Sequence, residues 1–177
     1  MEKTDTCFEG IVELTTGQQA ALKRSAGKTL DEVDAFALQS FFTAVLPQNR
    51  YDQEKAFAVA CIVCLWKPEE RVSPKPFASC LGMLRKSKGG ETKGLDSRFR
   101  SLIDTDWNDG DGYLAVKLVR LARMLKQSGT GYPDPESLFK DLKYWNHPDR
   151  FVQRRWMEQY LSTNETQPEE NQIQEEE

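Results

Sequence analysis

The sequence predicts an all-α protein, and three observations support this fold class. Apolar residues recur at the three- and four-residue spacing of a buried helix face over most of the chain. Capping residues precede several of these segments, and Gly or Pro follows them. Strand-like alternation is limited to a weak instance at Ile11–Leu14. We therefore expect a compact multi-helix bundle, built either as one unit or as two small helical lobes that share a core.

The N-terminal arm covers residues 1–15, and the first helix is expected directly after it. Thr16 and Gln19 have the spacing of a capping box, in which each side chain binds the other residue's backbone N–H. Gly27 fits the residue that ends a helix. This pattern predicts a short helix that begins near Thr16.

Two further helices are expected in the first third of the chain. Thr29 and Glu32 fit a second capping box, and the helix predicted after it ends at Pro47. Its apolar face follows the helical spacing and consists of Leu38, Phe41, Phe42 and Val45. Ala56–Trp66 is apolar on every side, which is typical of a central helix surrounded by others.

A less regular region follows. Residues 71–76 are a proline-punctuated connection, and a helix is expected over 77–85. Residues 86–94 contain three lysines and the pair Gly89-Gly90, which is typical of a mobile basic loop. We predict that this loop is the boundary between the two possible lobes.

The helix expected over 112–127 has the strongest amphipathic pattern in the chain, and a shorter helix of the same kind is expected over 95–103. Five apolar residues of the longer helix fall within about 100° of arc at about 3.6 residues per turn. They are Leu114, Leu118, Leu121, Ala122 and Leu125. The basic residues outside this arc are Lys117, Arg120, Arg123 and Lys126.

Two more helices complete the predicted bundle. Asp134 and Pro135 form an N-cap followed by a proline in the first turn. Pro148 and Asp149 are expected to start the last helix. The core-facing positions predicted for these two helices are Leu138, Leu142, Trp145, Val152, Trp156 and either Gln159 or Tyr160.

The net charge of −4 is divided unevenly along the chain. Six of the 28 acidic residues lie in residues 165–177, so the rest of the chain carries 24 basic residues against 22 acidic ones. A polar, acidic, aromatic-free segment cannot bury enough apolar surface to order itself. We therefore expect a disordered acidic tail over 163–177 and a helical domain over 16–162.

The four cysteines are expected to be free thiols, mostly buried. Cys61 and Cys64 form a CxxC pair inside an apolar helix and lack the second ligand pair of a zinc site, so we predict core residues. The acidic segment 104–112 matches the first ligand positions of a calcium-binding loop. However, Asp109 replaces its Gly and Ala115 its bidentate Glu. An acidic interhelical turn is the favoured interpretation.

No catalytic motif is recognisable. His147 is the single histidine and has no adjacent nucleophile motif, and residues 88–94 lack the spacing of a phosphate-binding P-loop. The longest apolar run, 56–66, is about half of the ~20 residues that cross a bilayer. We expect a soluble, cytoplasmic protein that is not an enzyme and holds no cofactor or metal.

Basic clusters opposite the apolar helix faces are the remaining functional signal. Arg suits bidentate phosphate contacts and Lys suits point-charge contacts. The predicted nucleic-acid-binding residues are Lys23, Arg24, Arg85, Lys86, Arg98, Arg100, Arg120 and Arg123. Because the sequence pI is 5.2, free and promiscuous DNA binding is disfavoured. Binding is expected mainly within a larger assembly.

Short segments between Gln18 and Leu161 share their pattern with one known family. They are Leu22–Arg24, Phe41–Pro47, Pro76–Leu84, Ser97–Ile103, Leu118–Leu121, Asp141–Trp145 and Trp156–Tyr160. In these segments the chain resembles the CasB family, the small subunit of the type I-E CRISPR Cascade complex. Ser97 and Val119 stand where the family carries Arg, and Arg100 and Arg123 lie close enough in sequence to supply the charge.

The resemblance implies a non-catalytic subunit, present in two copies along the guide-RNA backbone, that touches the backbone and large subunits. It also implies that the basic surface contacts target DNA and the displaced strand and stabilises the R-loop. Strand exchange is close to energetically balanced, so a few backbone contacts are enough to tip it. Two alternatives stay open: a helical protein–protein adaptor without nucleic-acid binding, and a divalent-metal enzyme using Asp104, Asp106 and Asp109.

Overall fold

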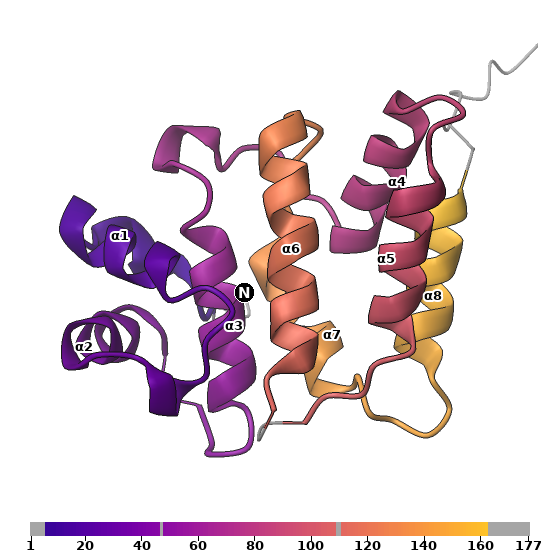
Figure 1. The fold of residues 1–177 in the computed structure, drawn as a ribbon. Coiled ribbons are helices and arrows are strands. Elements are labelled where there is room, and N and C mark those ends of the chain that lie inside the picture. Colours follow the sequence, from indigo (N-terminus) through magenta and orange to yellow (C-terminus); the bar gives the residue numbers. More distant parts are fainter. Residues whose placement is uncertain (1–5, 47, 109–110, 163–177) are drawn as a thin grey trace, which may run out of the picture.

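The computed structural model describes residues 6–46, 48–108 and 111–162, and within these ranges the protein is all-α, as predicted (Figure 1). The described residues form eight α-helices and three short 3-10 helices and no strand. The weak strand signal at Ile11–Leu14 was wrong, because this segment lies in the 3-10 helix η1, Glu9–Glu13, and the residue after it. Its backbone is satisfied locally, since the Leu14 N–H donates to the Ile11 carbonyl.

Helix α1 spans Thr16–Arg24, and its capping box lies one residue earlier than the sequence pattern predicted. The Gln18 N–H donates to Thr15 Oγ1 at 3.2 Å, and the Thr15 N–H donates to Gln18 Oε1 at 2.9 Å. Two adjacent threonines followed by two adjacent glutamines allow either register of the box. The residue that caps α1 is therefore Thr15 and not the predicted Thr16.

Helix α2 spans Ala35–Ala44 and does not begin at the second predicted capping box. That box exists, but it closes only the short 3-10 helix η2, Leu30–Glu32. The chain is extended at Asp34, whose carboxylate accepts a hydrogen bond from the Ala37 N–H at 2.9 Å and caps the new helix. Pro47, the predicted end, lies outside the described residues.

Helix α3, Gln53–Val63, is the central helix that the sequence predicted, but it begins and ends three residues before the predicted range 56–66. Every residue from Ala56 to Trp66 is buried. Cys61 and Cys64 are free thiols in this core, which confirms their predicted structural role. Burial raises the pKa of Cys64 to about 11, so the thiol stays protonated and unreactive near neutral pH.

Helix α4 spans Phe77–Ser87 and α5 spans Lys93–Ile103, so both helices extend into the segment 86–94 that was predicted as a loop. The division of the chain into lobes at this segment stays a prediction. Gly82 of α4 lies against the α8 backbone, where an added Cβ would come within 2.9 Å of the Gln159 carbonyl oxygen. This close approach holds α4 and α8 together as a pair.

Helix α6, Tyr113–Ser128, stands at the front of the molecule between the α1–α3 group and the α4–α5–α8 group (Figure 1). It packs against α3, α4 and α5. The five apolar residues predicted to face the core are all buried, which confirms the amphipathic pattern: Leu114, Leu118, Leu121, Ala122 and Leu125. The basic side of the helix is therefore left on the surface.

Helix α7, Pro135–Lys143, begins at the predicted cap, where Asp134 Oδ1 accepts a hydrogen bond from the Glu136 N–H. Helix α8, Phe151–Leu161, begins after the predicted Pro148-Asp149 start. Arg150 is left-handed, with φ 51°, and its guanidinium donates to the Ile103 carbonyl at 2.7 Å. This hydrogen bond holds the turn before α8 against the end of α5, so the helix begins at Phe151 and not at Pro148.

One contiguous hydrophobic core joins all eight helices, with Trp145 and Trp156 among its largest fully buried side chains. None of the helices in the described part of the chain is both long and apolar enough to span a membrane. The predicted acidic tail, residues 163–177, lies outside the described residues.

Candidate nucleic-acid interface

A basic hollow of about 230 Å³ lies between α5 and α6. Its lining consists of Ser97, Arg98, Ser101, Lys117, Arg120 and Leu121. Lys117 Nζ, in the first half of α6, donates to the Ser101 carbonyl in the last turn of α5 at 3.4 Å. Arg120, further along α6, shares the hollow with Arg98, which lies earlier in α5, so the two helices run antiparallel here. The fold thus brings together Arg98 and Arg120, which the sequence had placed in separate predicted clusters.

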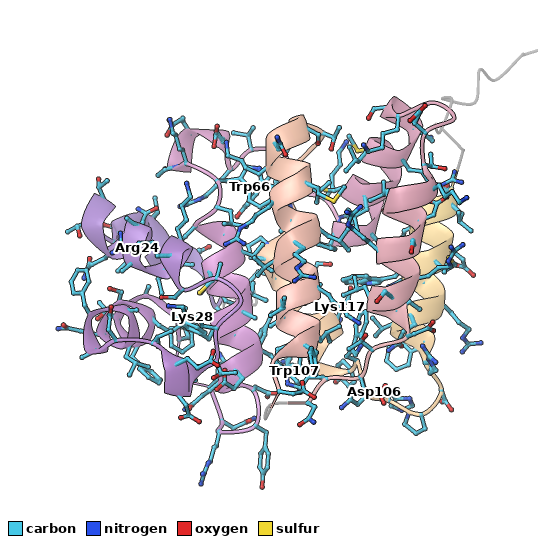
Figure 2. The ribbon with its side chains drawn as sticks, in the orientation of Figure 1. Arg24, Lys28, Trp66, Asp106, Trp107 and Lys117 are labelled. Carbon is cyan, nitrogen blue, oxygen red and sulfur yellow. The ribbon has the colours of Figure 1, made fainter. Side chains whose placement is uncertain are left out.

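The amphipathic patterns of both helices explain why these side chains meet at the surface. On α5, Leu95, Phe99 and Leu102 are buried, so residues 97, 98 and 101 lie on the opposite, exposed side. On α6, the leucines face the core, so Lys117 and Arg120 lie on the other side of the helix, next to α5. Figure 2 shows Lys117 on the side of α6 that faces α5.

The three cations of this hollow have no carboxylate partner among the described residues. Arg98 donates a long hydrogen bond of 3.3 Å to the Gly94 carbonyl. Lys117 is held by the Thr105 hydroxyl and by the Ser101 carbonyl at 3.4 Å. Clustered Arg and Lys side chains with adjacent hydroxyl groups suit the oxygens of a phosphate. The hollow therefore has the chemistry of an anion site.

A second basic group lies at the end of α1. Lys23 and Arg24 occupy its last turn and are exposed, and Lys28 follows in the next loop. This loop contacts α6, because a Cβ on Gly27 would lie 3.9 Å from Val116 Cγ2. Figure 2 shows Arg24 and Lys28 beside α1 on the face of the molecule that also presents Lys117. The α1 group and the α5–α6 hollow thus lie on one side of the protein.

The remaining arginines of α5 and α6 are distributed more widely. Arg123 is exposed one turn after Arg120, and Arg100 is exposed on α5 but does not line the hollow. Val119, which stands where the resembled family has Arg, is 2% exposed and packs in the core. Val119 therefore contributes to the core and adds no charge to the surface.

Arg85 is engaged within the fold. Its Nε lies 2.9 Å from Asp96 Oδ1, and its guanidinium lies 5.7 Å from the centre of the Tyr160 ring. Tyr160 also donates to Asp96, so α4, α5 and α8 meet at this group. Lys86, the other predicted residue of this cluster, is exposed in the last turn of α4 and does not line the hollow.

The contacts of Asp96 with Arg85 and Tyr160 predict a pH-dependent contribution to the stability of the fold. Hydrogen bonds from Tyr160, and then from Arg85 and Thr92, hold the pKa of Asp96 below its usual value, although partial burial opposes them. The ionised Asp96 carboxylate stabilises the folded state fully above the unfolded-state pKa of about 3.9. This stabilisation is lost as pH falls through the lower folded-state pKa. We expect Asp96→Asn to destabilise the protein at neutral pH and the difference from wild type to shrink in acid. Urea unfolding of both proteins across this pH range checks the prediction, and a difference independent of pH would contradict it.

Sequence reasoning missed Lys117 and Lys28 as members of this surface. Lys117 lies three residues before Arg120 on α6, so the helical period was the signal that could have identified it. Lys28 had no such signal, because its position depends on the contact between Gly27 and Val116.

The other candidate chemistries receive little support. Asp111 Oδ1 accepts a hydrogen bond from the Tyr113 N–H near the start of α6, and Asp109 lies outside the described residues. In the part of the chain that is described, no three His, Cys, Asp or Glu side chains are grouped as metal ligands. His147 is exposed, and its Nδ1 accepts a hydrogen bond from the Asp149 N–H at 3.2 Å.

Comparison with known proteins agrees with this architecture. The family described as CRISPR-associated protein Cse2 matches residues 18–161. A solved structure described as a CRISPR RNA-guided surveillance complex is similar over 85% of this chain and 84% of its own, with 24% identity and a TM-score of 0.62. A pre-nicking form has the same coverage and identity and a TM-score of 0.65.

The crystal structure of M. ruber CasB is also similar, with 16% identity, a TM-score of 0.62 and coverage of 85% of this chain and 89% of that one. At these identities the structural matches establish a shared fold. No curated protein matches the chain.

Proposed function

Because the chain belongs to the Cse2 family of CRISPR-associated proteins, we propose that it is the non-catalytic small subunit of a type I-E CRISPR Cascade surveillance complex. In this role its basic surface binds target DNA and the displaced non-target strand, which stabilises the R-loop during antiviral defence. The observation that carries the proposal is the hollow between α5 and α6, where Arg98, Lys117 and Arg120 converge.

The energetics of strand exchange suit such a role. The RNA–DNA heteroduplex is about as stable as the DNA duplex that it replaces. A few phosphate contacts to DNA therefore shift the equilibrium towards the open R-loop. Each Lys or Arg that neutralises a single-strand phosphate contributes about 0.7 to the slope of log affinity against log salt, without reading sequence.

The proposed partners follow from this assignment. Two copies of the subunit lie end to end beside the guide RNA and contact the backbone and large subunits. The low overall pI fits weak DNA binding by the free subunit and stronger binding within the assembly.

A protein–protein adaptor without nucleic-acid binding is the alternative, and exposed apolar side chains favour it. Phe36 and Phe42 of α2 are 48% and 55% exposed, and Leu46 after the helix is 46% exposed. Large apolar side chains exposed on one helix and on the segment after it suit contact with another protein. Such an interface also suits a subunit of a larger complex.

Gentle affinity purification of the tagged protein from its native cell separates the two functions. The proposal predicts that a guide RNA of uniform length is recovered together with several copies of a backbone subunit. Recovery of protein partners without RNA would favour the adaptor.

A further inference from the structure

Tyr113, the first residue of α6, is an aromatic side chain that the fold itself does not use. It is 63% exposed, and its side chain has no ring contact or hydrogen bond with the other described residues. The next residue, Leu114, turns into the core and is 1% exposed. Packing therefore does not account for an aromatic ring at position 113.

The position of Tyr113 relates it to the α5–α6 hollow. Tyr113, Lys117 and Arg120 are spaced i, i+4 and i+7, so they form one stripe along α6. At about 1.5 Å of rise per residue, Tyr113 lies about 10 Å along the helix axis from Arg120. Lys117, between them, contacts Thr105 at the end of α5. Tyr113 therefore lies on α6 beyond the Lys117 end of the hollow, just outside its lining residues and on the side away from Arg120.

This arrangement matches the two contacts that proteins make with a single strand. Cations follow the phosphates, and an aromatic ring stacks on an exposed base without regard to its sequence. A base inside a duplex is already stacked on its neighbours and is not available to the ring. We propose that Tyr113 and the α5–α6 hollow form a site for single-stranded nucleic acid, in which Arg98 and Arg120 hold phosphate and Tyr113 stacks on a base. This inference rests on the proposed function and adds a base-stacking contact and the residue that makes it.

Fluorescence anisotropy with the full-length chain and a labelled oligothymidine at low salt tests the site. Tyr113→Ala is expected to weaken binding about tenfold, in line with the loss of one base-stacking contact. Tyr113→Phe keeps the ring and is expected to bind like wild type. Tyr51→Ala is the matched control, because Tyr51 is 81% exposed on a different segment, and it is expected to have no effect.

An abasic oligonucleotide and the salt dependence separate stacking from phosphate binding. Tyr113→Ala and wild type are expected to bind the abasic strand equally and to have the same salt slope. Neutralising Arg98 and Arg120 is expected to lower that slope. If Tyr113→Ala binds oligothymidine like wild type while the arginine variant loses slope, the stacking site is overturned and the proposed function stands. If wild type binds neither strand at low salt, alone or within the assembled complex, both are overturned.

Discussion

Reversing the charges of Arg98 and Arg120 together, as Arg98→Glu and Arg120→Glu, is expected to weaken target-DNA binding by the assembled complex about 100-fold. Each guanidinium is assigned one charge-assisted contact with phosphate, worth about 1.5 kcal/mol, and ~1.4 kcal/mol is tenfold in affinity. The slope of log affinity against log salt should fall by about 1.4 for two single-strand phosphates. Electrophoretic mobility or filter binding at several salt concentrations measures both quantities.

The same variant should fold normally, because both side chains are exposed and surface substitutions usually change stability by about 0.5 kcal/mol or less. The matched control is Lys140→Glu with Arg154→Glu, which changes the net charge equally on the exposed sides of α7 and α8. We expect the control to bind DNA like wild type. Equal binding losses in the two variants would mean that net charge, and not the hollow, governs affinity.

Replacing Trp156 with alanine is expected to cost about 3–5 kcal/mol of unfolding free energy, as for other large aromatic side chains in cores. Trp156 is fully buried, with its ring centre 5.4 Å from that of Phe77 on α4 and 5.0 Å from that of Trp145. Its Nε1 donates to Asp141 Oδ2 at 2.7 Å. The substitution thus removes ring packing and a buried hydrogen bond together, and urea unfolding measures the loss.

Trp156→Phe separates the two contributions, because it keeps much of the ring packing and removes the N–H donor. Burial raises the pKa of Asp141, while the hydrogen bond from Trp156 and the charge of Arg155 act in the opposite direction. Trp156→Phe leaves Asp141 Oδ2 without its buried donor, which costs about 1–3 kcal/mol. Because Phe keeps much of the ring packing, the total loss should be smaller than for Trp156→Ala. A loss below about 1 kcal/mol for Trp156→Ala would contradict the account of the core.

The sequence was most informative where a helix was long and strongly two-sided. Helix α6 could be predicted almost to its ends because its leucines and its basic residues occupy opposite arcs. Capping patterns were less reliable at helix boundaries. The capping box at Thr29 and Glu32 closes only a 3-10 turn. Because the same two hydrogen bonds form whether or not an α-helix follows, the pattern does not fix where a helix starts. The start of α8 depends on the distant contact between Arg150 and Ile103, which no local pattern contains.

The candidate site could be predicted in part, because clusters of basic residues are visible in the sequence but their partners are not. Arg98 and Arg120 meet because α5 and α6 pack antiparallel. Arg85 carries the same charge and was predicted alongside them, but the fold pairs it with Asp96. Whether a basic side chain is paired depends on tertiary packing, which charge clustering along the chain does not reveal.

The most direct test of the central claim is site-specific photocrosslinking from the hollow itself. A benzophenone amino acid at Ser101, an exposed lining residue without a charge, is introduced into the tagged subunit of an assembled complex. The complex is then loaded with target DNA whose two strands carry different labels. The account predicts a covalent adduct with a DNA strand that forms only after the R-loop opens. Crosslinks to neighbouring protein subunits alone, in complexes that hold an open R-loop, would contradict it.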